Sequence, residues 1–500
     1  MSARPIERVP AHHLSLVSSE PASPAARKTT SADLVSGDLL SSDLNSTQVP
    51  ADTAPVGRSA EIVPIRRGHE PVRRRRGWPT ALSALSVPAY RLWLSSQVIA
   101  TTGLWMQRIA QDWLVLEISG SVAAVGVAVA LQFLPVLLFG LVGGVIVDRF
   151  PKRTLLIITQ SVAALLAATL GVLALSGAAQ VWQVYLVAFA LGMVTVIDNP
   201  TRQVFVAELV GDRHIGNAVS LNSSVFQFGA LVGPALTGIL IGAVGQGWSF
   251  LINAAACLLV VGMVAVIRPT QVRTAKPLAS GEAQRGQLRA GLGYIRHTSE
   301  VVWAIVLVGT IGVLGLNLPV LLTAFADHEF GTGVGGYSLY NSANAAGAFL
   351  GAVLSARRTR IPRIRMLVIF LIAFGAVTAV ISLAPSQWLF MSGLVLAGTL
   401  TLLFLTGANS LVQTSVPAAL RGRVMSVYIL VLLGGQALGG PVVGWLADQF
   451  GARPSMALCG GLIALVVATY AVRIARHSHL GLAMDLHHQH GRSPIRIVAS

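Results

Sequence analysis

Five polar or ionisable side chains recur along one apolar stretch near the start of the chain. They are Gln97, Thr101, Trp105, Arg108 and Asp112, spaced by four, four, three and four positions. This spacing places them on one face of an α-helix, where Arg108 and Asp112 can pair across a turn. The stripe can line a polar cavity, with Asp112 able to take up and release a proton. The structural alternative is a permanent ion pair that fixes this helix.

A second set of charges follows directly after a long apolar stretch, in the segment GGVIVDRFPKR at residues 143–153. Its charged residues are Asp148, Arg149, Lys152 and Arg153. Gly144 has no side chain, so we expect it to let a helix pack closely. The segment therefore combines a packing position with charges that can form an electrostatic gate.

Asp198 and Arg202 form a further charged pair, again one helix turn apart. Partly dehydrated charges interact more strongly than exposed ones, so the pair is a candidate for the same gate. The alternative is a stabilising surface pair of small energy.

Several side-chain amides lie in other apolar stretches, where they either line a cavity or form hydrogen bonds between helices. The candidates for the cavity are Asn222, Gln227, Asn317 and Asn344. The sequence does not distinguish the two roles.

One apolar stretch contains three small residues and a proline, namely Gly229, Gly233, Pro234 and Gly238. Small residues allow helices to approach closely, and proline removes one backbone hydrogen bond and bends the helix. A bent, tightly packed helix can seal one side of a cavity; a tolerated kink is the alternative.

The composition of the chain indicates the kind of structure that positions these residues. The chain has 500 residues, of which 54% are hydrophobic and 11% charged. A soluble domain carries roughly 25% charge, so the lipid bilayer is the expected solvent. A spanning helix needs about 20 apolar residues, and the chain offers twelve such segments. They are 91–117, 122–147, 154–176, 181–203, 217–244, 249–267, 301–326, 337–356, 365–384, 387–416, 424–446 and 455–474. The fold class is therefore an all-α integral membrane protein.

Polar segments divide this chain into five regions. We expect a disordered cytoplasmic tail at 1–84, a six-helix half at 85–268, a cytoplasmic loop at 269–300, a second six-helix half at 301–476 and a cytoplasmic tail at 477–500. Lys and Arg gather in the connections that follow even-numbered helices, whereas Arg453 is the basic residue of the odd connections. By the positive-inside rule both termini are cytoplasmic, which accounts for the net charge of +16 without nucleic acid.

The two halves repeat weakly. LVGPALTGIL at 231–240 matches LGGPVVGWLA at 438–447, and Gly144 matches Gly351 at the same offset of 207 residues. Parallel repeats of this kind place a binding site between the halves, near the bilayer midplane.

With these features the chain resembles the major facilitator superfamily of secondary transporters. GGVIVDRFPKR matches that superfamily's signature between helices two and three, and GALVGPALTG at 229–238 looks like the fifth-helix signature of proton-coupled exporters. RLWLSSQVIATTGLWMQRIAQDWLVLEISGS, DNPTRQVFVAELV and RGRVMSVY resemble a bacterial branch that includes enterobactin exporters and macrolide-efflux-type proteins.

The resemblance implies a gate in which Asp148, Lys152 and Asp198 form a charge network. Two positions depart from the pattern: Pro151 replaces a common glycine, and Ser355 stands where a second-half aspartate would map. The acidic member of the gate therefore occurs once.

These observations lead to one expected function and two alternatives. We expect a proton-coupled exporter of a small organic compound, such as a drug or siderophore, in the inner membrane of a bacterial cell. The alternatives are a nutrient importer and a non-transporting receptor. We expect a monomer with no metal, no cofactor beyond the proton gradient, and no enzymatic activity; GxxxxGK[ST], HExxH and GxSxG motifs are absent from the sequence.

Overall fold

The computed structural model describes residues 80–268, 293–358, 363–477, 480–484 and 495–499. Most of the expected tail at 1–84, most of the central loop at 269–300 and part of the expected tail at 477–500 lie outside these ranges.

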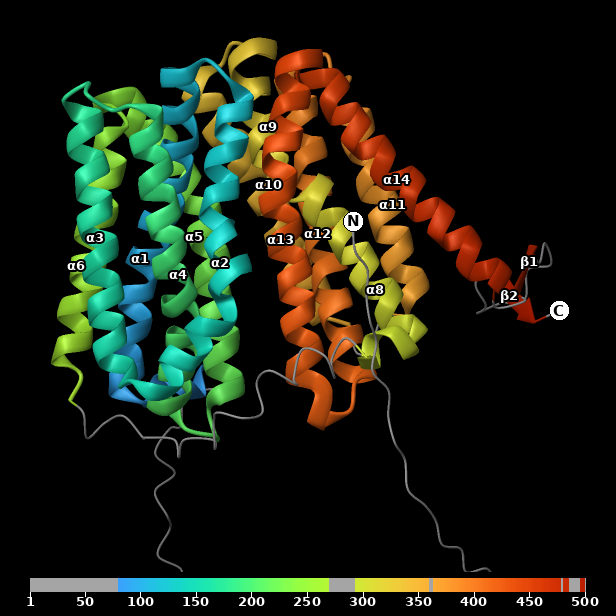
Figure 1. The fold of residues 1–500 in the computed structure, drawn as a ribbon, viewed down its shortest axis with the longest axis horizontal. Coiled ribbons are helices and arrows are strands. Elements are labelled where there is room, and N and C mark those ends of the chain that lie inside the picture. Colours follow the sequence, from blue (N-terminus) through green and yellow to red (C-terminus); the bar gives the residue numbers. More distant parts are fainter. Residues whose placement is uncertain (1–79, 269–292, 359–362, 478–479, 485–494, 500) are drawn as a thin grey trace, which may run out of the picture. The chain divides into compact units, whose positions relative to one another are not determined.

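The first half begins with a short 3₁₀ helix, η1 (Thr80–Ser86), followed by six long helices (Figure 1). These are α1 (Pro88–Ser119), α2 (Val122–Arg149), α3 (Lys152–Leu175), α4 (Val181–Val210), α5 (Ile215–Val244) and α6 (Gly247–Val266). Helix α1 starts at a proline, whose missing N–H costs nothing in the first turn. It ends at Gly120, whose φ of 63° lies in the left-handed region that favours glycine.

The first span of the second half is not a continuous α-helix. It consists of α8 (Ser299–Thr310), the π-helical turn η3 (Ile311–Gly315), α9 (Leu318–Ala324) and the π-helical turn η4 (Phe325–Glu329). The remaining helices are α10 (Gly333–Ala356), α11 (Ile364–Ile381), α12 (Gln387–Ser415), α13 (Ala418–Phe450) and α14 (Ala452–His477). Near the C-terminus, β1 (Leu480–Met484) pairs antiparallel with β2 (Ile495–Ala499).

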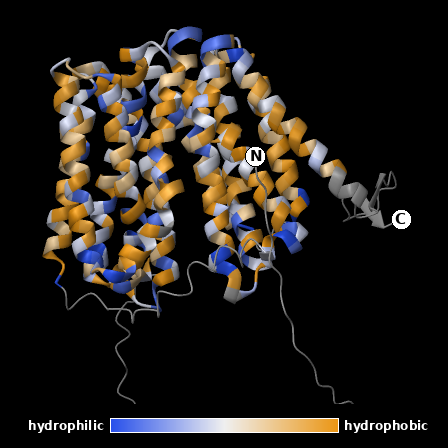
Figure 2. Ribbon diagram, viewed as in Figure 1, coloured by the Kyte–Doolittle hydropathy of each residue, from blue (hydrophilic) through white to orange (hydrophobic). Residues whose placement is uncertain are grey.

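The prediction of an all-α membrane fold with twelve spans is confirmed, with the first span of the second half broken as described. In the described chain, ten helical segments are long and apolar enough to cross a membrane. Hydrophobic residues dominate the helices in Figure 2. Helices α1 and α10 complete the set of twelve; α1 carries Arg108 and Asp112, which lower its hydropathy.

The hydrophobic core is shared between the halves at one end and separate at the other. We call the end that carries the α1–α2 connection the outer end. There, one cluster contains Leu114 and Val125 of the first half together with Leu321 and Val443 of the second. At the opposite end each half has its own cluster, one around Trp93 and Phe205 and the other around Phe404 and Tyr428. The halves are therefore joined at the outer end.

Glycines allow the two halves to approach at this end. Helices α2 and α13 lie side by side (Figure 1), and a Cβ at Gly126 would collide with the carbonyl of Gly440. Helices α5 and α10 form a second contact between the halves. There, the Ser342 hydroxyl of α10 donates a hydrogen bond to the Leu231 carbonyl of α5 at 3.2 Å. Backbone approach of this kind is typical of small residues at membrane helix interfaces.

Candidate functional site

A cavity of about 230 Å³ lies between the two halves. The first half contributes Trp105, Arg108 and Asp112 from α1 and Phe133 from α2. The second half contributes Asn317 at the start of α9, Asn341 and Asn344 from α10, and Gln436 from α13. The cavity thus combines one acid, one base, two aromatic rings and several amides, as expected for a site that binds a polar or amphipathic molecule.

Asp112 joins the two halves at this cavity. Its side chain is buried, and its Oδ2 accepts a hydrogen bond from the Tyr337 hydroxyl of α10 at 2.9 Å. The Tyr337 ring stacks against Trp113, with centroids 6.2 Å apart. The other oxygen, Oδ1, is buried without a hydrogen-bond partner among the described residues. A buried carboxylate with one unsatisfied oxygen can accept a proton or a donor from a ligand.

Arg108 does not pair with Asp112: no salt bridge joins them in the described chain. Its guanidinium instead lies over the Trp105 ring at 5.1 Å and near the Phe133 ring at 5.9 Å. Cation–π contacts stabilise a partly dehydrated cation without neutralising it. The permanent Arg108–Asp112 ion pair, the structural alternative drawn from the sequence, is therefore not the arrangement in this structure.

Asn317 lines the cavity at an irregular part of its helix, between η3 and α9. Its Nδ2 donates to the carbonyl of Val313, within the π-helical turn η3, at 2.9 Å. Its Oδ1 is buried and has no partner among the described residues. π-helical turns often occur at functional sites.

Gln97 lies in a different cluster, away from the cavity. Its side-chain oxygen accepts a hydrogen bond from Arg202, which also forms an ion pair with Asp198. Asp198 accepts two further hydrogen bonds, from Thr159 at 2.8 Å and Gln160 at 2.9 Å. This buried network joins α1, α3 and α4 within the first half, and a charged pair with this many hydrogen bonds is well compensated for burial.

The predicted charge network of the loop after α2 is not assembled here. Asp148 is exposed and forms no ion pair with the described residues, so it is not joined to Asp198. Lys152 donates to the Phe150 carbonyl at 3.4 Å, and Arg153 donates to the carbonyls of Val264 and Ala265 in α6. Arg149 is exposed. The gate function of these residues stays a prediction.

The expectation that Gly144 permits close helix packing is wrong. A Cβ at Gly144 would meet nothing within 4 Å, whereas a Cβ at the adjacent Gly143 would collide with the Val196 carbonyl of α4. Successive helix positions point about 100° apart, so only one of two neighbouring glycines can face α4.

The α5 motif packs on helices from both halves. A Cβ at Gly229 would lie 2.8 Å from Thr101, and one at Gly233 would lie 2.6 Å from Trp105, both on α1. A Cβ at Gly238 would lie 2.8 Å from Ser338 on α10. Pro234 is buried between these contacts. Thr101 is thus a packing position against α5 and does not line the central cavity.

The sequence predicted some cavity residues and missed others. Trp105, Arg108, Asp112, Asn317 and Asn344 line the cavity, while Asn222 and Gln227 are half-buried on α5 outside its lining. The sequence missed Phe133 and Gln436, which line the cavity, and Tyr337, which binds Asp112. Tyr337 carried a signal, because it is a large aromatic residue with a polar hydroxyl directly after the glycine-rich residues 333–336 of its helix.

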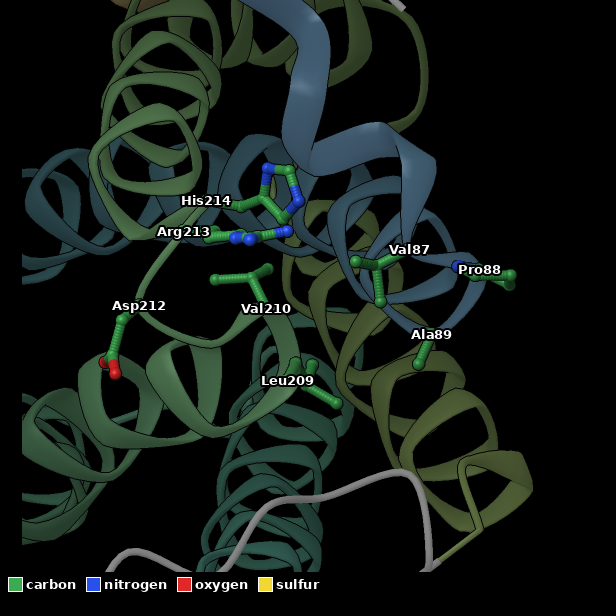
Figure 3. A pocket seen from close by; sticks show the side chains of 8 residues that line it. All are labelled: Val87, Pro88, Ala89, Leu209, Val210, Asp212, Arg213 and His214. Atoms are coloured by element: carbon green, nitrogen blue, oxygen red, sulfur yellow. The ribbon is translucent and has the colours of Figure 1, made fainter. Parts of the chain in front are cut away.

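A second hollow of about 720 Å³ lies at the opposite end of the first half, between the start of α1 and the α4–α5 connection. Figure 3 shows Arg213 and His214 above apolar side chains such as Val87 and Val210, with Asp212 directed away. It lies within one half and contains none of the residues of the central cavity.

Two six-helix halves around a central polar cavity define a membrane transporter. The chain belongs to the transmembrane secretion effector family, whose model matches residues 79–491, and its relatives are transporters of the major facilitator superfamily.

Two curated relatives are exporters. The multidrug efflux pump Tap of Mycolicibacterium fortuitum is 26% identical over 400 residues, covering 78% of this chain and 96% of the relative. The enterobactin exporter EntS of Escherichia coli O1:K1 / APEC is 24% identical over 409 residues, covering 80% and 95%. The solved structure of the nucleoside transporter NupG matches with a TM-score of 0.62 at 13% identity, covering 77% of this chain and 99% of that chain, which shows the shared fold.

Proposed function

We propose that this transporter exports a small organic compound in exchange for protons. The observation that carries the proposal is Asp112, a buried carboxylate that lines the cavity at the boundary of the two halves. One of its oxygens binds Tyr337, and the other has no hydrogen-bond partner among the described residues. The Asp112 carboxylate can bind a proton or a ligand. Either event changes its hydrogen bond to Tyr337, which is a contact between the two halves.

Proton and substrate then compete at the cavity. A substrate that presents a donor to Asp112 favours its ionised form, while a proton entering from the opposite side displaces that substrate. Because the halves are joined at the outer end in this structure, we propose that substrate enters the cavity from the cytoplasmic end. The two halves then rock and open the outer end.

The direction of transport rests on two observations. The α5 motif, which resembles that of proton-coupled exporters, packs against both α1 and α10 and so can keep water out of this side of the cavity. In addition, the relatives Tap and EntS are described as an efflux pump and an exporter. A drug-like or siderophore-like compound is the corresponding substrate class for this chain. We also propose that the termini are cytoplasmic and that the energy comes from the proton gradient.

Vesicle transport tests this function. Purified protein in proteoliposomes is tested with ethidium and enterobactin as probes and an imposed proton gradient. Protons moving down the gradient should drive the probe in the opposite direction and should appear in the compartment that the probe leaves. Comparing medium and extracts of cells with and without the gene identifies the natural compound. Uptake of a nutrient together with protons would instead favour the importer, and absence of flux for every compound so identified would favour a receptor.

A further inference from the structure

A carboxylate from the second half caps the first turn of a helix in the first half. Asp448, near the C-terminal end of α13, accepts hydrogen bonds from the backbone N–H of Val122 at 2.7 Å and of Ala123 at 3.0 Å. It also accepts a hydrogen bond from the Ser121 hydroxyl at 2.6 Å. All three donors belong to the start of α2, so the cap joins the two halves at the outer end.

The backbone is shaped for this contact. One turn before Asp448, a Cβ at Gly444 would lie 2.5 Å from the Val122 carbonyl and 2.8 Å from the Ala123 Cα. Any larger side chain at Gly444 would push α13 away from the first turn of α2 and out of hydrogen-bond range.

The electrostatics favour the joined state. The first N–H groups of a helix have no partner within it, and the N-terminus carries partial positive charge. The C-terminal end of a helix carries partial negative charge, so Asp448 is unfavourably placed with respect to its own helix. Contact with α2 supplies both the donors and the positive potential. When the halves separate, water replaces the α2 donors around Asp448. The contact can therefore favour the state in which the outer end is closed and still be released.

The same residue pattern occurs at the other end of this helix pair. The end of α2 contains a glycine, an aspartate and a phenylalanine at positions 144, 148 and 150. The end of α13 contains the same residue types at the same spacing, at positions 444, 448 and 450. Since the end of α13 meets the start of α2, the two helices run antiparallel, and the pattern places one carboxylate at each end of the pair. Both carboxylates are exposed, but Asp448 accepts hydrogen bonds from α2, whereas Asp148 forms no ion pair with the described residues.

We propose that Asp448 is an outer gate residue, which holds the halves together at the outer end and is released once in each transport cycle. Its role does not depend on the substrate or on proton coupling. It depends only on the two-halves fold and on the orientation that places the α1–α2 connection outside.

The test measures opening directly. The natural cysteines, Cys257 and Cys459, are replaced by serine, and Ala128→Cys places a reporter thiol in the shared core beneath the cap. Right-side-out vesicles are treated with a membrane-impermeant maleimide. We expect Asp448→Ala to raise the labelling rate by about tenfold, the effect of losing a typical helix cap, and Ser121→Ala to raise it less.

Glu329→Gln is the matched control. Glu329 lies at the same end and binds Arg453 at 2.6 Å, but both residues belong to the second half, so its loss should leave the labelling rate unchanged. Labelling of detergent-unfolded protein normalises the amount of reporter. Equal rates in the parent and in Asp448→Ala would overturn the proposal, as would an equal rise in Glu329→Gln. If Asp448→Ala does not fold, Asp448→Asn, which keeps the shape and loses the charge, decides by the same criteria. None of these readouts requires flux, so failure of the gate is distinct from failure of the proposed transport function.

Discussion

The Tyr337 hydroxyl of the second half donates a hydrogen bond to the Asp112 carboxylate of the first half across 2.9 Å. The two residues are 225 positions apart, and both are buried. Their contact places the acid of the cavity at the boundary that must open when the outer end opens. It therefore links the chemistry of the site to the arrangement of the halves.

Tyr337→Phe should weaken the closed outer end. It removes one hydrogen bond to a charged group, a loss of about 1.5–3 kcal/mol before relaxation. We expect outside labelling of the Ala128→Cys reporter to rise roughly tenfold. Tyr340→Phe is the control, because the Tyr340 hydroxyl contacts Thr332 of its own half at 3.1 Å. A rise of the same size in both variants would mean that the Asp112 contact has no special role.

Gly143→Ala and Gly144→Ala should have different effects although the residues are neighbours. A methyl group at Gly143 has no room against Val196, and overpacking of this kind costs about 1–3 kcal/mol. A methyl group at Gly144 meets open space, and alanine favours a helix over glycine by about 1 kcal/mol. Thermal unfolding of the purified protein in detergent should thus show a lower midpoint for Gly143→Ala alone. A similar loss in Gly144→Ala would show that α2 packs differently.

Asp198→Asn should destabilise the first half. It leaves Arg202 without its charged partner in a buried network, a change that costs about 3–5 kcal/mol. The midpoint of thermal unfolding should fall clearly, and Asp212→Asn, at an exposed position on the α4–α5 connection, should leave it unchanged. An unaltered midpoint combined with altered transport would move Asp198 from a stabilising role to the predicted gate.

Asp148→Asn should slow the transport cycle more than it weakens substrate binding. Asp148 is remote from the cavity lining, so substrate contacts are preserved, while any gate contact formed in another state is lost. The measurement compares the maximal rate with the half-saturating concentration of the probe. An equal loss in both would argue against a gate.

The arrangement of the helices could be predicted from the sequence because the bilayer imposes a length on every span. Observed spans such as α2 (Val122–Arg149) and α12 (Gln387–Ser415) begin at the predicted residues. The π-helical turns on either side of α9 could not be predicted, since hydropathy reports length and not the hydrogen-bond pattern within a helix.

The site was only partly predictable for a similar reason. Helical spacing correctly placed Trp105, Arg108 and Asp112 on one face, but it extended that face to Gln97, which instead binds Arg202. A helix of 32 residues passes different neighbours along its length, so one stripe can serve two sites. The partners Tyr337 and Asp448 come from the other half, and no local pattern reports contacts across more than 200 residues.

The role of Asp112 is tested most directly by its isosteric variant. Asp112→Asn keeps the shape and an acceptor for Tyr337 but cannot exchange a proton. Efflux of the probe from vesicles should be accelerated by an imposed proton gradient in the parent protein. In Asp112→Asn we expect probe exchange to continue while the efflux rate becomes independent of the gradient. A variant that still responds to the gradient as the parent does would contradict the account.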